Sequence, residues 1–224
     1  MIIVSALSIQ DPRERPIDSA EKADKAHEKF VNENSDFLWF INIWQFYHKQ
    51  LKKLSQNKLR KLCQQNFLSY MRMREWQDIH RQLRHVCTEM GLTINSDAAS
   101  YQNIHCAILT GMPSNVAFLS DKYEYTGARG INLHLFPASS QFDKRPKWIV
   151  AADLLETSRL FARNVARIES QWLINTAQHL LKRHYAEPQW DSKSARVIAQ
   201  ESISLCGMIL VANKKVNYGP VNLV

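Results

Sequence analysis

The hydrophobic positions in the first half of the chain recur at helical spacing. Residues 37–47 read FLWFINIWQFY, with large apolar side chains on nearly every face, a pattern typical of a buried helix. We therefore expect Trp39, Trp44 and Phe46 to lie in a core. Residues 51–91 form a long helical stretch, in which steps of three and four residues join Phe67, Tyr70, Met71, Arg74, Asp78 and Arg81. The pattern predicts one all-helical unit over residues 1–110.

After Pro113 the pattern changes to short runs rich in valine, phenylalanine, tyrosine and leucine, separated by glycine and proline. Such punctuation is typical of strands and turns. Residues 148–168 fit two interpretations, because their alanines, leucines and glutamates favour a helix while the segment follows Pro146 and strand-like neighbours. Residues 169–184 are expected to form a closing helix, and residues 196–205 and 207–216 a hairpin.

Composition narrows the classes of protein. Of the 224 residues, 45% are apolar, which is enough to bury a core. No run of about 18 apolar residues exists, so no membrane span is expected. The apolar start, residues 1–7, is too short for a signal peptide. The cysteines are widely spaced without a CxxC pair, which argues against zinc and disulfides and for reduced thiols in a cytoplasmic protein.

The charge points to a polyanionic partner, since the chain carries a net charge of +8. Residues 49–85 hold ten lysines and arginines against Glu75 and Asp78, a surplus equal to that of the whole chain. Two interpretations remain open: a solvated helix face, or a nucleic-acid face whose phosphate contacts give affinity with little sequence information. The candidate RNA-binding residues here are Lys58, Arg60, Lys61, Arg72, Arg74, Arg81 and Arg84.

Other residue patterns carry less chemistry. His80 and His85 with Asp78 place no third ligand, so no metal site is expected. Ser158 lacks the glycines of a nucleophile elbow, and no catalytic residue is predicted.

Several segments together resemble one family, the bacterial HrpA-type DEAH-box RNA helicases, in the part that follows the ATPase. They are IIVSALSIQDPRERP (2–16), EWQDIHRQL (75–83), YTGARG (125–130), PKWIVAADLLETSRLFAR (146–163) and VNYGP (216–220). The chain departs from the family where FPASSQF (136–142) replaces a turn that usually holds two glycines. If those glycines used positive φ, Ala138 and Ser140 would strain the turn.

The resemblance implies an α+β fold in three parts. Residues 1–110 match a helical ratchet-like domain, residues 111–175 an OB-fold β-barrel, and residues 176–224 the start of a C-terminal helix and hairpin extension. It also implies that residues 148–168 are two antiparallel strands with a tight bend near residues 156–159, and we adopt this interpretation.

An OB-fold suggests a second candidate site, because such barrels bind single strands through basic grooves and exposed aromatic rings. The alternative is that the tyrosines pack within the sheet and the lysines only solvate loops. The candidates are Lys122, Tyr123, Tyr125, Arg129, Lys144, Arg145 and Lys147.

The resemblance implies ATP-driven RNA or ribonucleoprotein remodelling for a full helicase. The 224 residues contain no GxxxxGK[ST] phosphate loop, no DEAH tetrad and no QRxGRAGR-type arginine-finger motif. ATP and Mg²⁺ are therefore expected to bind RecA-like domains outside this sequence. The expected partners are single-stranded or structured RNA and that helicase core. The alternatives are a protein-interaction module docking on a partner such as the ribosome, and a non-functional remnant of an interrupted helicase gene.

Overall fold

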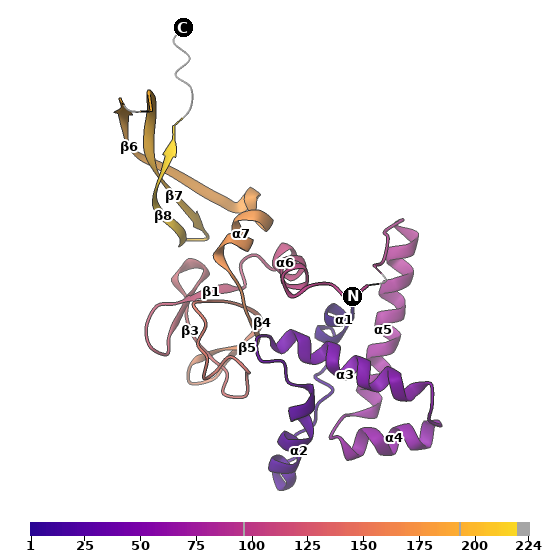
Figure 1. The fold of residues 1–224 in the computed structure, drawn as a ribbon. Coiled ribbons are helices and arrows are strands. Elements are labelled where there is room, and N and C mark those ends of the chain that lie inside the picture. Colours follow the sequence, from indigo (N-terminus) through magenta and orange to yellow (C-terminus); the bar gives the residue numbers. More distant parts are fainter. Residues whose placement is uncertain (96, 193, 219–224) are drawn as a thin grey trace. The chain divides into compact units, whose positions relative to one another are not determined.

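The computed structural model describes residues 1–95, 97–192 and 194–218, which fall into two compact units (Figure 1). The helical unit comprises residues 1–98 with 138–143, and the β-rich unit comprises residues 99–137 and 144–224. The sequence pattern places the change of character after residue 110. The units divide earlier because α6 (Tyr101–Gly111) packs on α7 (Ser170–Thr176), where Tyr101 also donates a hydrogen bond to the carbonyl of Arg167.

The helical unit begins with short helices and ends with longer ones. Its elements are α1 (Ile2–Leu7), η1 (Ile17–Ser19), α2 (Ala20–His27), η2 (Glu28–Phe30), α3 (Asp36–Leu51), α4 (Gln56–Gln65) and α5 (Tyr70–Glu89). The helical stretch predicted over residues 51–91 is therefore broken into two helices. At the break between α4 and α5, the Asn66 side chain donates to the carbonyl of Leu62 and Phe67 adopts a φ of 51°, so α4 cannot continue. Within the described residues, no helix is long and apolar enough to cross a bilayer.

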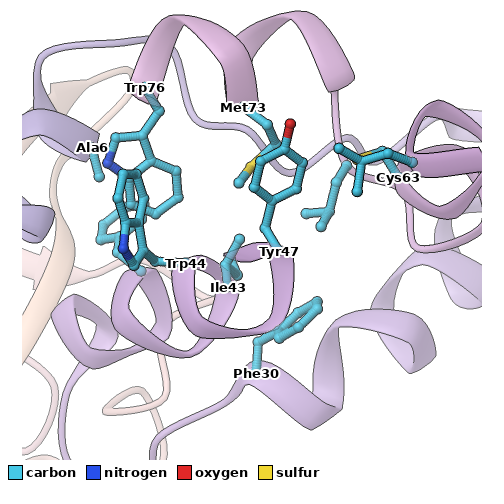
Figure 2. Packing of buried hydrophobic residues seen from close by; sticks show 11 residues of the cluster. Ala6, Phe30, Ile43, Trp44, Tyr47, Cys63, Met73 and Trp76 are labelled. Carbon is cyan, nitrogen blue, oxygen red and sulfur yellow. The ribbon is translucent and has the colours of Figure 1, made fainter. Parts of the chain in front are cut away.

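Side chains from α1, α3, α4 and α5 meet in one apolar core (Figure 2). The rings of Trp44 and Trp76 lie 5.0 Å apart between centroids. The indole N–H of Trp76 donates to the Ser5 hydroxyl at 3.0 Å and to the Ile2 carbonyl at 3.1 Å. This burial carries no unsatisfied donor, which is the usual condition for a tryptophan inside a core. The prediction that Trp44 is a core residue is confirmed.

The same prediction holds in part for Phe46, which is half-buried but packs against this core, and it is wrong for Trp39, which is only half-buried. Seven residues apart on α3, they share one face of the helix. Cations cover that face: the Arg13 guanidinium carbon lies 4.7 Å from the Trp39 ring centroid, and the Lys29 ammonium lies 4.6 Å from that of Phe46. The exposed sides of the aromatic helix are thus closed by cation–π contacts.

The DPRERP turn is an extended segment bonded to the connection between α4 and α5. Glu14 donates its N–H to the carbonyl of Phe67, and Ser69 donates to that of Pro12, both at 2.8 Å. The guanidinium of Arg13 pairs with Asp11 at 2.6 Å while covering Trp39. The motif therefore holds the helical unit together.

Residues 138–143 belong to the helical unit through the first turn of α3. The buried Asp36 carboxylate accepts the Ser139 hydroxyl at 2.6 Å, and the Ser140 hydroxyl and N–H at 2.7 and 2.9 Å. Neither Ala138 nor Ser140 is among the residues with positive φ. The turn without glycine therefore carries no positive-φ strain, and its two serines supply donors for a buried carboxylate.

The β-rich unit contains a closed five-stranded barrel in the order β1-β2-β3-β5-β4. Its strands are β1 (Val116–Leu119), β2 (Tyr125–Gly127), β3 (Asn132–Leu135), β4 (Trp148–Glu156) and β5 (Leu160–Arg167), with η3 (Ala128–Gly130) between β2 and β3. The parallel pairing of β3 with β5 closes the barrel. Gly127 is required at a close approach, since a Cβ there would lie 3.3 Å from the Leu133 side chain. The OB-like barrel predicted from the resemblance is confirmed.

The strand interpretation of residues 148–168 is confirmed. β4 and β5 pair antiparallel from Ile149↔Arg167 to Glu156↔Leu160. The bend lies where predicted, with the Thr157 N–H donating to the Arg159 carbonyl at 2.9 Å. Closure of the barrel overrides the helical propensity of this segment.

A separate three-stranded sheet follows the barrel, in the order β6-β7-β8. The predicted hairpin is confirmed as β7 (Arg196–Leu205) and β8 (Met208–Asn217). The closing helix predicted over residues 169–184 is too long, because α7 ends at Thr176, η4 (Gln178–Leu180) follows, and β6 (Leu181–Asp191) takes the rest. Gly219 and Pro220 of the VNYGP motif lie outside the described residues.

Replacement of Trp44 with alanine should lower the free energy of unfolding by about 3–5 kcal/mol, as large-to-small changes in a core do. Trp39→Ala is the control, because a half-buried ring covered by Arg13 leaves a smaller cavity. Urea denaturation followed by circular dichroism measures both. Equal losses for the two variants would contradict the assignment of Trp44 to the core.

The helical unit should lose stability in mild acid. The rings of His48 and His80 lie 4.0 and 4.5 Å from that of Trp44, and burial lowers the pKa of both imidazoles below their usual value. A lowered folded-state pKa means that the unfolded chain takes up protons first. Stability is therefore complete above a pH of about 6.5 and falls as the pH drops below it.

The melting temperature should accordingly be lower at a pH of about 5.5 than at about 7.5, and His48→Gln with His80→Gln should reduce the difference. The control is His85→Gln on α5, whose side chain is 74% exposed. A pH dependence unchanged in the double variant would rule out these two histidines as its source.

Candidate nucleic-acid interface

The basic helical segment presents most of its predicted cations to solvent. Lys58, Arg60 and Lys61 are exposed on α4, and Arg74, Arg81 and Arg84 are exposed on α5. Leu59 and Cys63 of α4 enter the same core as Met73 of α5, so the apolar side of each helix is turned inward. The charged residues occupy the remaining faces, and we call these six the helical cations.

Arg72 does not belong with the helical cations. It is half-buried, and its guanidinium donates to the carbonyl of Asp11 at 2.9 Å. This bond ties α5 to the segment that carries DPRERP. Its role as an RNA-binding candidate stays a prediction, and the structure adds a structural role, because the guanidinium has a backbone partner inside the unit.

Arg81 remains exposed but has an acidic neighbour. Its guanidinium lies 3.2 Å from the Asp78 carboxylate, one turn earlier on α5. Both side chains are more than half exposed, so the pair contributes little free energy. A phosphate can compete for this guanidinium at low cost.

On the barrel, the structure brings three of the predicted residues together. Tyr123 is 53% exposed, and the Arg145 guanidinium carbon lies 4.0 Å from its ring centroid. The Lys122 ammonium lies 5.3 Å from the same centroid. We call Lys122, Tyr123 and Arg145 the Tyr123 cluster. It joins an exposed ring to two cations, the combination that single-strand binding requires for bases and phosphates.

The turn that leads into β2 sets the direction of Tyr123. The Glu124 N–H donates to the carbonyl of Asp121, and the Ser120 N–H donates to that of Glu124. The Nδ1 of His134 on β3 lies 3.0 Å from the Tyr123 carbonyl, as its donor. His134 is the residue of this site that the sequence analysis missed. The sequence could have indicated it, because His134 alternates with the buried Leu133 and Leu135, and this alternation predicts that its side chain points outward.

Tyr125 is a correction to the predicted stacking pair. It is fully buried in the barrel core, and its hydroxyl donates to the carbonyl of Pro146 at 2.8 Å. Burial raises the pKa of this phenol above its usual value. No face of the ring is open to a base, so the sheet-packing alternative describes Tyr125 correctly.

The remaining barrel candidates are exposed but do not all share one place. Lys147 follows the segment with Arg145, and its carbonyl accepts the Leu119 N–H at the end of β1. Lys144 is exposed in the same segment. Arg129 lies in η3, beyond the end of β2 opposite to Tyr123, with a φ of 60°. Its N–H donates to the carbonyl of Cys206, which places it beside the β7–β8 turn.

The cysteines of the described residues differ in burial. Cys63 is buried, and burial raises the pKa of its thiol to about 11. The other cysteines are half-buried and free. Among the described residues, no three histidine, cysteine or acidic side chains are grouped as a metal site would need.

Comparison with known proteins agrees with the barrel and with the resemblance. A family model described as "Oligonucleotide/oligosaccharide-binding (OB)-fold" matches residues 104–180. The chain is 48% identical to "ATP-dependent RNA helicase HrpA" of Escherichia coli (strain K12) over 223 residues, and 47% identical to its homologue in Haemophilus influenzae. These matches cover 99% of this chain and 17% of each relative.

A human relative, "Probable ATP-dependent RNA helicase DHX35", is 27% identical over 183 residues, or 81% of this chain and 25% of that protein. The resemblance to HrpA-type RNA helicases is thereby confirmed over nearly the whole chain. The chain spans about a sixth of the length of the two bacterial relatives.

The two tyrosines should respond oppositely to substitution. Tyr125→Phe removes a buried hydrogen bond and should lower stability by about 1 kcal/mol without changing oligonucleotide affinity. Tyr123→Ala should leave stability nearly unchanged and weaken single-stranded RNA binding by about 1–3 kcal/mol, the usual effect of losing one stacking ring. Thermal melts and fluorescence anisotropy separate the two effects. Unchanged affinity in Tyr123→Ala would exclude the Tyr123 cluster as a stacking site.

Proposed function

We propose that this chain is an RNA-binding accessory segment of an ATP-dependent DEAH-box RNA helicase, placed after the ATPase core. The observation that carries the proposal is the Tyr123 cluster on a closed OB-like barrel, in a chain that is 48% identical to an HrpA helicase over 99% of its length. The chain grips RNA while RecA-like domains elsewhere in the full protein bind ATP and Mg²⁺. The full protein remodels RNA or ribonucleoprotein in the cytoplasm.

The chemistry of the two surfaces supports a grip that tolerates many sequences. The helical cations offer charge to phosphates, which every RNA strand carries. The Tyr123 cluster adds a ring against which any base can stack. Phosphate contacts and base stacking of this kind carry little sequence information. Binding of this kind suits a motor that must hold successive nucleotides of an arbitrary strand.

The motor chemistry is assigned to the rest of the helicase. The sequence lacks the phosphate loop, whose backbone amides and lysine hold a nucleoside triphosphate. The purified chain should therefore bind RNA without hydrolysing ATP.

A charge-matched pair of variants tests the helical cations. Lys58 and Lys61 lie three residues apart on α4, and Lys22 and Lys25 lie three residues apart and exposed on α2. Lys58→Ala with Lys61→Ala should weaken binding of a single-stranded oligouridylate. It should also reduce the slope of log affinity against log salt by roughly 0.7 for each lost phosphate contact. Lys22→Ala with Lys25→Ala removes the same charge and should change the affinity and the salt slope less.

The salt series, measured by fluorescence anisotropy, decides between a specific surface and general attraction. Equal effects of the two lysine pairs would mean that only net charge matters. Affinity that does not depend on salt, or binding to ribosomal protein but not to RNA, would favour a protein-interaction module instead.

A further inference from the structure

The C-terminal sheet carries a second group of exposed aromatic rings. Trp190 on β6 is 64% exposed, Tyr218 just after β8 is 49% exposed, and Tyr185 on β6 is 40% exposed. The rings of Tyr185 and Tyr218 lie 5.3 Å apart between centroids. Because β6 and β8 flank β7 on opposite sides, this contact must pass over one face of β7. We call that side of the sheet the aromatic face.

Strand register shows that Trp190 shares the aromatic face. Tyr185 pairs with Glu201, so residues of β7 at even distance from 201 lie on this face. Without an irregularity, Trp190 would lie on the opposite face, five residues after Tyr185. A bulge between Ala186 and Gln189 inserts one extra residue, with Glu187 at a φ of 50°, and Trp190 then pairs with Val197. On the β8 side of β7, the Tyr218 N–H donates to the carbonyl of the same Val197.

The bulge thus re-aims one large ring onto the face that already holds two others. A one-residue shift exchanges the faces of every following side chain. Bulges are frequent beside functional sites for this reason. Ala199 of β7 lies between the rings and is only 2% exposed. Its small side chain does not cover the rings, which therefore form the surface.

The position of Tyr185 is fixed by a buried carboxylate. Its hydroxyl donates to Glu201 at 2.9 Å, and Arg183 pairs with the same oxygen at 2.6 Å. Glu201 is 7% exposed and also lies opposite Lys214 on β8. Among the described residues paired across this face, Glu201 is the sole carboxylate, and it lies between two cations. The charge left at the surface is positive.

We propose that Tyr185, Trp190 and Tyr218 form a stacking platform for the bases of single-stranded RNA, separate from the Tyr123 cluster and flanked by Arg183 and Lys214. This proposal rests on the proposed function, because it takes RNA as the polyanion that the basic chain binds. Exposed rings on a three-stranded sheet with flanking cations fit unpaired bases and their phosphates. A protein partner that buries the same rings is the alternative, and the tests below separate the two.

The test compares the two faces of the same sheet in the full 224-residue chain. Trp190→Ala and Tyr218→Ala should each weaken binding of a fluorescein-labelled oligouridylate by at least about fivefold, the lower end for one lost stacking contact. Trp190→Phe should retain most of the affinity. The matched control is Ile209→Ala, which is 62% exposed and apolar but pairs with Ser204 on the opposite face. Unchanged affinity in Trp190→Ala and Tyr218→Ala overturns the proposal.

Crosslinking of 4-thiouridine RNA to the unaltered chain provides a second readout, which does not depend on the folding of any variant. Crosslinks to residues 181–191 or to Tyr218 support the platform, and crosslinks confined to other segments overturn it. If the unaltered chain self-associates in sedimentation, and Trp190→Ala abolishes this association while RNA affinity is unchanged, the aromatic face is a protein interface and the proposal falls.

The outcomes also separate this proposal from the broader one. Loss of affinity in Tyr123→Ala but not in Trp190→Ala removes the platform and leaves the accessory RNA-binding function intact. Loss in Trp190→Ala but not in Tyr123→Ala keeps the platform and removes the Tyr123 cluster. An unaltered chain that binds no RNA at any salt concentration overturns both.

Discussion

The alternation of side chains along paired strands decides what the β-rich unit can offer to a ligand. In the barrel, closure by β3 and β5 leaves every strand with one inward face, and Tyr125 is on it. Had β2 started earlier, Tyr123 would have shared that face, since only Glu124 lies between it and Tyr125. The turn at residues 121–124 interrupts the alternation and leaves Tyr123 outside against Arg145. In the C-terminal sheet, the bulge in β6 likewise interrupts the alternation and places Trp190 on the aromatic face.

The helical unit solves a different problem, which is how to bury an aromatic helix within a small bundle. α3 is apolar on nearly every side, yet other helices cover only part of it. Trp44 takes the covered side, against Trp76 and two histidines, while Arg13 and Lys29 close the side of Trp39 and Phe46. The family-specific DPRERP motif is therefore explained by packing and backbone pairing. A segment that identifies a family need not touch its ligand.

The sequence predicted the helices, the barrel strands and the C-terminal hairpin, because each had a clear period or a family precedent. It could not predict β6, whose residues are mostly exposed and include Pro188, so no alternation of buried side chains marked the strand. The break between α4 and α5 depends on Phe67 in a left-handed conformation, which composition does not reveal. Burial separated Tyr125 from Tyr123, and a single backbone bond separated Arg72 from its basic neighbours. Such distinctions require tertiary contacts.

The exposed surfaces have one chemical property in common, which explains how they could serve a helicase without specifying its substrate. Each combines cations, aromatic rings or both. Stacking and phosphate contacts depend on features that all RNA strands share. Where a hydrogen-bonded neighbour fixes such a group, as Glu201 fixes Tyr185, the group loses little conformational freedom on binding. In the proposed function, preorganised and sequence-tolerant contacts would hold a strand firmly at one nucleotide and equally well at the next.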